Sequence, residues 1–185
     1  IAAGRTFLSA EMAQKLALES VAGERDPLSA LTPREFEIFR LLAAGIVFVV
    51  SIISANYMSE RTKTAAEFYG LMLIGGCAMV YMAAATELIT AYISLELLSF
   101  SLYILVGYLK RDNLSSEASL KYILLGAFSS AMFLYGMSLV YGVTGTTTYE
   151  GIGAALADRS ADTDTAVITG FMLIIAGVGF KVSAA

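Results

Sequence analysis

Three ionisable residues that lie in otherwise apolar segments are the residues of this sequence best able to do chemistry. Glu96 lies near the midpoint of the apolar segment 87–108, Lys121 lies near the start of the next, and Lys181 follows the uncharged run 165–180. A carboxylate at a bilayer centre costs about 2.5 to 3.5 kcal/mol, and such groups usually face a bundle interior where they serve ion or proton movement. We therefore take Glu96, Lys121 and Lys181 as candidate proton-translocation sites.

The surroundings of Glu96 on its predicted helix are polar on one side. Hydroxyl groups at helical spacing could hold water or bond the acid, so we expect supporting roles for Tyr92, Ser99 and Tyr103, with Phe100 on the same face. The opposite faces are apolar and carry Ile93, Leu97, Leu98, Ile104 and Leu105. The alternative is a protonated structural acid that bonds a neighbouring helix.

The two lysines differ in their surroundings. Lys121 lies four residues after Glu117, so the two can form a surface ion pair, and a lysine near a helix end can also reach the interface. Alternatively Lys121 faces the same interior as Glu96. We expect Ser115 or Ser116 to cap this helix, which places Glu117 in its first turn, where the helix dipole favours an anion. Lys181 is harder to explain as a solvated residue, and a buried lysine near a carboxylate is a switchable proton site.

Composition places the chain in the membrane. It has 185 residues, of which 57% are hydrophobic and 15% charged, with a mean hydropathy of +0.72, which is typical of a polytopic membrane protein. The absence of histidine and the single cysteine, Cys77, exclude a haem histidine ligand, a cysteine-ligated iron–sulfur cluster and most zinc sites. We therefore expect no catalytic residue, metal site or cofactor site here, and any redox chemistry on another chain.

Five apolar segments predict an all-α membrane bundle, with helices at about 39–58, 67–85, 87–108, 116–141 and 165–185. The first connection carries Arg61 and Lys63 and the third Lys110 and Arg111, whereas the second and fourth are acidic. The positive-inside rule places the first and third connections in the cytoplasm. Residues 1–40 would then lie on the opposite side.

Residues 1–40 have a different, amphipathic and charged pattern and predict a short soluble helical segment, separate from a membrane domain at 41–185. Ser9 can cap one helix, and Thr32 can cap a second with Pro33 at its first position and Glu35 in its first turn. The stretch DPLSALTPREFEIFRLLAAG and the residues before it resemble the start of the helix-turn-helix domain of LuxR/NarL-type response regulators. The recognition helix that enters the major groove is missing, so we expect no nucleic-acid binding and an apparent fusion.

The membrane part closely resembles subunit N of proton-pumping NADH-quinone oxidoreductase, respiratory complex I, over residues 46–185. The stretches ELLSFSLYILVGY, SLKYILLGAFSSAMFLYG and TGTTTYEGIGAAL carry the resemblance. It implies that Glu96 and Lys181 translocate a proton and that Lys121 modulates them. It also implies an antiporter-like fold of inverted repeats, of which this chain is expected to be a fragment without the opening helices and the second repeat.

The same resemblance implies the setting. NADH, FMN, iron–sulfur clusters and quinone are expected on other subunits, the partners are the other membrane subunits of complex I and the lipid bilayer, and the location is the bacterial inner membrane. One alternative is a subunit of an Mrp-type cation/proton antiporter, which shares the fold. An alternative of another class is a truncated, membrane-tethered LuxR-type transcriptional regulator, which the missing recognition helix disfavours.

Overall fold

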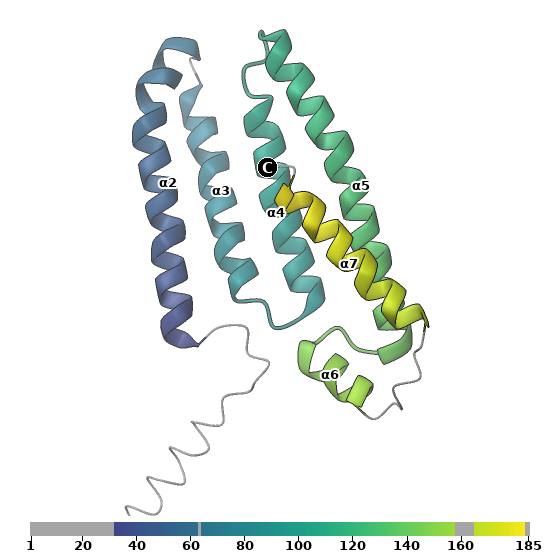
Figure 1. Cartoon of the computed structure of the whole chain (residues 1–185). Coiled ribbons are helices and arrows are strands. Elements are labelled where there is room, and N and C mark those ends of the chain that lie inside the picture. Colours follow the sequence, from purple (N-terminus) through teal and green to yellow (C-terminus); the bar gives the residue numbers. More distant parts are fainter. Residues whose placement is uncertain (1–31, 63, 158–164, 184–185) are drawn as a thin grey trace, which may run out of the picture.

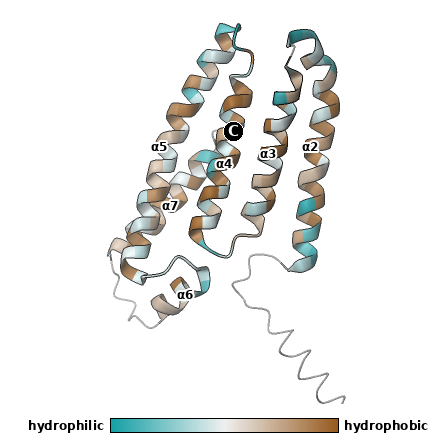
Figure 2. Cartoon of the chain, turned by 180° about the vertical axis from the view of Figure 1, so that it is seen from behind, coloured by the Kyte–Doolittle hydropathy of each residue, from teal (hydrophilic) through white to brown (hydrophobic). Residues whose placement is uncertain are grey.

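The computed structural model describes residues 32–62, 64–157 and 165–183, which contain helices joined by short connections (Figure 1). The elements are α2 (Pro33–Arg61), α3 (Ala65–Ala83), α4 (Leu88–Val106), α5 (Asn113–Thr144), α6 (Tyr149–Ala157) and α7 (Thr165–Ser183). Every helix except α6 is long and apolar enough to cross a membrane, and hydrophobic residues run along these helices (Figure 2). The predicted all-α, multi-pass membrane bundle is confirmed.

Helix α2 begins as the sequence predicts. The Thr32 side chain accepts a hydrogen bond from the Glu35 backbone N–H, the Glu35 carboxylate accepts one from the Thr32 backbone N–H, and Pro33 occupies the first turn. The helix then continues without a break through residue 40 into the first apolar segment. Residues 33–40 and the first apolar segment therefore form one continuous helix. The division of the chain into two domains at residue 40 stays a prediction. The helix expected after Ser9 lies outside the described residues.

The start of α5 differs from the prediction. The cap is Asp112, whose carboxylate accepts the Leu114 backbone N–H at 3.0 Å, and not Ser115 or Ser116. The helix therefore begins earlier, and Glu117 falls beyond its first turn. The Ser115 hydroxyl instead donates to the Val106 carbonyl at the end of α4, at 2.5 Å. A side chain that is already bonded to the preceding helix is not available as a cap.

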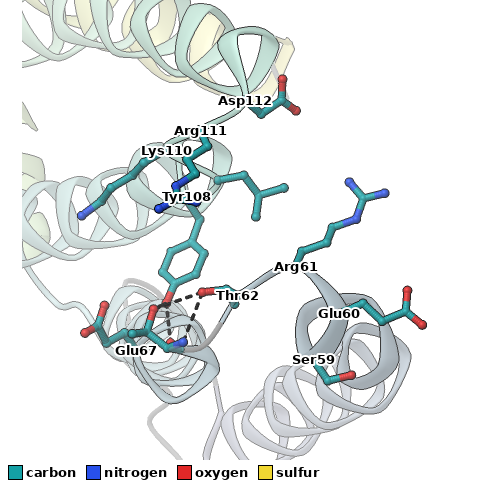
Figure 3. A pocket seen from close by; sticks show the side chains of 11 residues that line it. Ser59, Glu60, Arg61, Thr62, Glu67, Tyr108, Lys110, Arg111 and Asp112 are labelled. Carbon is teal, nitrogen blue, oxygen red and sulfur yellow. Dashed lines mark hydrogen bonds between the residues drawn. The ribbon is translucent and has the colours of Figure 1, made fainter.

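The helix connections meet in pairs at opposite ends of the bundle. At one end the Tyr108 hydroxyl donates to the Thr64 carbonyl at 2.5 Å, which ties the α4–α5 connection to the α2–α3 connection (Figure 3). Arg61, Lys110 and Arg111 border a cleft of about 850 Å³ there. At the other end Glu87 forms an isolated antiparallel bridge with Thr148. The basic first and third connections therefore share one end, as the sequence predicts.

The nine-residue helix α6 is a feature that the sequence did not predict, and it lies at the Glu87 end of the bundle (Figure 1). Its anchor is Glu87, whose carboxylate accepts the Thr90 hydroxyl at 2.8 Å and the Thr147 hydroxyl at 3.1 Å. Burial raises the pKa of the Tyr149 hydroxyl, and the nearby charge of Glu87 raises it further.

Helix α7 lies obliquely against α5, and its described end reaches the middle of α4 (Figure 1). The two helices approach closely at glycines. A Cβ atom on Gly136 would lie 2.5 Å from the Gly170 carbonyl oxygen, and one on Gly170 would lie 2.9 Å from the Gly136 carbonyl oxygen. Backbone contact of this kind is how membrane helices pack tightly without a hydrophobic driving force. The α5–α7 contact fixes the path of α7 toward α4.

We expect Gly136→Ala to destabilise the bundle by about 1 to 3 kcal/mol, because the added methyl group meets backbone that cannot rotate away. Gly142→Ala in the same helix is the matched control, since a Cβ atom there meets nothing within 4 Å, and it should gain about 0.5 to 1 kcal/mol of helix propensity. The temperature of helix loss in detergent, followed by circular dichroism, measures both. Equal temperatures for the two variants would contradict the assignment of this contact.

The raised pKa of Tyr149 predicts a pH dependence. The folded chain holds the neutral phenol, so this contribution to the free energy of unfolding is complete below the ordinary tyrosine pKa of 10.0 and is lost as the pH rises above it. Unfolding temperatures measured on both sides of that pH should fall less for Tyr149→Phe than for the native chain. An identical fall in both proteins would show that Tyr149 does not contribute.

Candidate functional site

The structure brings Lys181 and Glu96 together inside the bundle. The Lys181 Nζ donates to Glu96 Oε1 at 2.7 Å and to Ser99 Oγ at 3.0 Å. The two charged side chains are 8% and 16% exposed. The contact joins residues 85 positions apart in the sequence, and it is the arrangement expected of a membrane-embedded ion pair.

The face of α4 that carries Glu96 is buried in the bundle. Ser99 and Tyr103 are buried at 7% and 4% exposure, whereas Ile93, Leu97 and Ile104 are largely exposed. The predicted orientation of Glu96 toward the bundle interior is thus confirmed. Phe100, predicted on the same face, is 58% exposed and that expectation is wrong. A residue four positions after Glu96 lies about 40° to one side of it around the helix, and the bundle packs on the other side, where Ser99 and Tyr103 lie.

Ser99 gives the lysine an acceptor in addition to the carboxylate. Its hydroxyl donates to the Leu95 carbonyl at 2.7 Å, which uses its only proton. The Ser99 oxygen therefore remains free to accept from Lys181. Two acceptors, one charged and one neutral, share the ammonium, so the lysine keeps one hydrogen bond even when the carboxylate is neutralised.

Tyr92 supports the site by packing. Its ring stacks on Phe133 of α5 with centroids 5.3 Å apart and planes 19° from parallel. Phe133 belongs to the buried cluster that also includes Met137, Val140 and Ile174. Tyr92 therefore fixes α4 against α5, one helical turn from Glu96.

Lys121 lies elsewhere. Its Nζ bonds the Glu117 carboxylate at 2.5 Å, and the two side chains are 70% and 59% exposed. The predicted i, i+4 ion pair is confirmed, but the expectation that Lys121 shares an interior with Glu96 is wrong for this structure. The inner face of α5 at this level belongs to Tyr122, whose ring lies 4.7 Å from that of Tyr103, and to Gly126, over which the Tyr103 hydroxyl lies. The modulating role of Lys121 stays a prediction.

The contribution of α5 to the site is what sequence reasoning missed. Ser129 is fully buried and donates to the Gly177 carbonyl of α7 at 2.7 Å. The signal was present as small residues at helical spacing, Gly126, Ser129 and Gly136, which are typical of a close helix contact. Among the described residues no three histidine, cysteine, aspartate or glutamate side chains group as a metal site would require.

Comparison with known proteins identifies the family. Residues 85–185, more than half of the chain, match the family model described as NADH:quinone oxidoreductase/Mrp antiporter, TM. The chain belongs to this family. Both Glu96 and Lys181 lie in the matched region of the NADH:quinone oxidoreductase/Mrp antiporter family.

Similar proteins within this family are quinone oxidoreductase subunits. The chain is 43% identical over 150 residues to NADH-quinone oxidoreductase subunit N of Trichlorobacter lovleyi, covering 81% of this chain and 30% of that protein. It is 40% identical over 148 residues to NAD(P)H-quinone oxidoreductase subunit 2 of Gloeothece citriformis, covering 80% and 29%. The chain thus spans less than a third of the length of the curated relatives it matches.

Two solved respiratory complexes contain chains of similar structure. One is the membrane-bound sulfane sulfur reductase, an archaeal respiratory membrane complex, with a TM-score of 0.61, 28% identity and coverage of 76% of this chain and 28% of that one. The other is respiratory complex I from Thermus thermophilus with bound aureothin, with a TM-score of 0.58, 30% identity and coverage of 79% and 29%. The helix arrangement described above is therefore that of an NADH:quinone oxidoreductase/Mrp antiporter subunit.

The site geometry predicts unequal costs for losing the two lysines. Lys181→Met leaves a buried carboxylate without its counter-charge, which costs roughly 3 to 5 kcal/mol at neutral pH. Lys121→Met is the matched control, because an exposed pair contributes only about 0 to 1 kcal/mol. Unfolding temperatures in detergent test this, and the deficit of Lys181→Met should exceed that of Lys121→Met. Equal deficits in the two variants would contradict the burial of the Glu96–Lys181 pair.

Proposed function

We propose that this chain is part of a proton-translocating membrane subunit of the subunit N type in NADH-quinone oxidoreductase, in which Glu96 and Lys181 form a proton site. The observation that carries the proposal is the buried, directly bonded Glu96–Lys181 pair at mid-depth of a membrane-spanning bundle. An ion pair with this placement is expensive to maintain. Proton transfer provides a reason for it, whereas helix packing alone is achieved with neutral side chains.

The relatives favour this branch of the family over the Mrp-type antiporters. The family description covers both kinds of protein, but the similar proteins described above are quinone oxidoreductase subunits at 40% to 43% identity. The stretches around Glu96 and Lys121 that suggest subunit N lie in the described helices α4 and α5. We therefore propose no cation exchange by this chain.

The pair would work by changing the charge balance of a low-dielectric site. While Glu96 is ionised, its carboxylate stabilises the Lys181 ammonium across 2.7 Å. When a proton arrives on Glu96 the ammonium loses its counter-charge, and an uncompensated buried charge is costly. That cost favours onward transfer of the lysine proton, after which the neutral amine can accept the next one.

Hydroxyl groups would extend the site along α4. Ser99 already accepts from Lys181, and Tyr103 lies one turn further along the same buried face of α4. Tyr103 lies toward the α4–α5 connection, at the end with the basic residues, and Tyr92 lies on the other side of Glu96. We assign Ser99 and Tyr103 to hydrogen-bonding support and Tyr92 to packing support. Lys121 and Glu117 would act from the bundle surface by modulating this end of the route.

The proposed setting follows from the same reasoning. Redox chemistry, with NADH, FMN, iron–sulfur clusters and quinone, belongs to other subunits, and the membrane partners are the remaining membrane subunits of such a complex. The location would be the bacterial inner membrane with the basic end of the bundle in the cytoplasm. The Arg61, Lys110 and Arg111 side chains at the cleft of that end support this orientation.

For the N-terminal part we propose an origin in a truncated LuxR/NarL-type regulator, without retained DNA binding. The LTPRE stretch supports the origin, and the continuation of α2 into apolar residues in place of a recognition helix supports the loss. Fluorescence anisotropy with mixed-sequence duplex DNA should show no affinity beyond non-specific binding, about 10⁻⁴ to 10⁻⁶ M. Tighter, sequence-dependent binding would overturn this part of the proposal.

The proposed function is tested in a full-length subunit that contains this segment, assembled in its complex. Glu96→Gln should leave assembly nearly intact, because size and hydrogen bonding are preserved, and should strongly reduce proton pumping by removing the titratable group. Glu96→Asp should be milder. Lys181→Met should damage pumping more than Lys121→Met, since only Lys181 bonds Glu96.

The measurement is NADH-driven acidification of inside-out vesicles, normalised to the amount of assembled complex. A normal proton-to-electron ratio in both the Glu96→Gln and Lys181→Met variants would show that the pair is structural. A sodium-dependent proton exchange without NADH would indicate the antiporter alternative instead.

A further inference from the structure

We propose that Ser129 of α5 is a positioning residue for Lys181, acting through the Gly177 carbonyl of α7. The inference rests on the proposed function for its consequence in pumping, but its geometric part stands independently. The Ser129 hydroxyl donates to the Gly177 carbonyl at 2.7 Å, and the Ser129 residue is completely buried. The bond links two helices that are 48 residues apart in the sequence at this point.

Gly177 is placed to transmit this bond to the lysine. It lies four residues before Lys181, so its carbonyl is the acceptor that the Lys181 backbone N–H uses within the α-helix. One carbonyl oxygen therefore serves both Ser129 and the backbone of the lysine. The rotation of α7 about its axis is fixed at the turn that carries Lys181, and that rotation decides whether the side chain reaches Glu96.

The close approach of the two backbones makes the bond possible. A Cβ atom on Gly177 would lie 2.9 Å from the Ser129 carbonyl oxygen and 3.0 Å from the Phe133 Cβ. Any other side chain would therefore push α7 outward. Phe133 in turn stacks on Tyr92 of α4, so the same region of α5 also holds the helix that carries Glu96. Helices α4 and α7, which carry the two partners of the ion pair, thus both pack against α5 (Figure 1).

A neighbouring serine provides the matched control. Ser130 also donates its hydroxyl to a backbone carbonyl, but that carbonyl belongs to Gly126 of its own helix, at 2.9 Å. Ser130→Ala thus removes a partly buried hydroxyl from the same helical turn without removing a hydrogen bond to α7. A purely local effect on α5 would appear in both variants, whereas positioning of Lys181 would appear only at Ser129.

The geometric test measures the Glu96–Lys181 proximity directly in the 185-residue chain in membranes. Cysteines replace Glu96 and Lys181 in a Cys77→Ser background, and a short bifunctional thiol reagent links them. The two cysteines carry no opposite charges that would attract α4 and α7 to each other. The cross-linking rate therefore reports how well the contact with α5 alone orients α7. We expect Ser129→Ala to lower the cross-linking rate by about threefold to tenfold, the effect of one lost hydrogen bond, and Ser130→Ala to leave it unchanged.

The second comparison separates hydrogen bonding from packing. Ser129→Thr and Ser129→Val both add a methyl group, but only threonine keeps the hydroxyl. The threonine variant should cross-link faster than the valine variant, and this comparison remains informative if Ser129→Ala fails to accumulate. Equal rates for threonine and valine, or for Ser129→Ala and Ser130→Ala, would overturn the positioning role.

The functional arm uses the full-length subunit in its complex. Ser129→Ala should reduce pumping per assembled complex, and adding it to Lys181→Met should cause no further loss, because both changes act through one lysine. Independent, multiplicative losses would overturn the proposal. Normal pumping by Glu96→Gln and Lys181→Met together with a slowed cross-linking rate in Ser129→Ala would instead overturn the proposed function and leave the positioning role intact.

Discussion

The burial of a carboxylate in the middle of a membrane-spanning helix is the constraint on which this structure depends. Glu96 cannot stay ionised in a low-dielectric interior without a compensating charge, and Lys181 supplies it at 2.7 Å. Because the lysine belongs to a helix far along the chain, the fold must bring that helix to mid-depth beside α4. Helices α2 to α5 lie side by side, whereas α7 crosses them obliquely and so meets this requirement (Figure 1).

Helix α5 is the element that satisfies this constraint. It contacts α7 through glycine backbones and the Ser129 hydroxyl, and it contacts α4 through the Tyr92–Phe133 stack. Helix α7 is held by close packing and a hydrogen bond, and α4 is held by aromatic contact and by hydrogen bonds from the Ser115 and Ser119 hydroxyls to its carbonyl groups. None of these contacts requires a charge, which leaves the ion pair as the charged interaction inside this part of the described bundle.

The sequence was sufficient for the parts of the fold that depend on local chemistry. Apolar segment lengths predicted the five membrane helices, Thr32, Pro33 and Glu35 predicted the start of α2, and the polar residues Ser99 and Tyr103 predicted which way Glu96 points. The sequence did not show which face of each helix meets which neighbour. The exposed position of Lys121 depends on Tyr122 and Gly126 occupying the inner face of α5, and the start of α5 depends on Ser115 bonding the end of α4. Which residue occupies the inner face of a helix, and which group a side chain bonds, depends on how the helices pack.

The proposed function requires the Glu96–Lys181 pair to change its protonation during turnover. Infrared difference spectroscopy of the assembled complex, comparing resting and NADH-energised states, observes this directly. We expect a carboxyl band of a protonated glutamate that appears or disappears on energisation and is absent in Glu96→Gln. A spectrum in which the Glu96 carboxylate signal is identical in both states would overturn the proposed function, because a pair with fixed charges can stabilise the bundle but cannot move a proton.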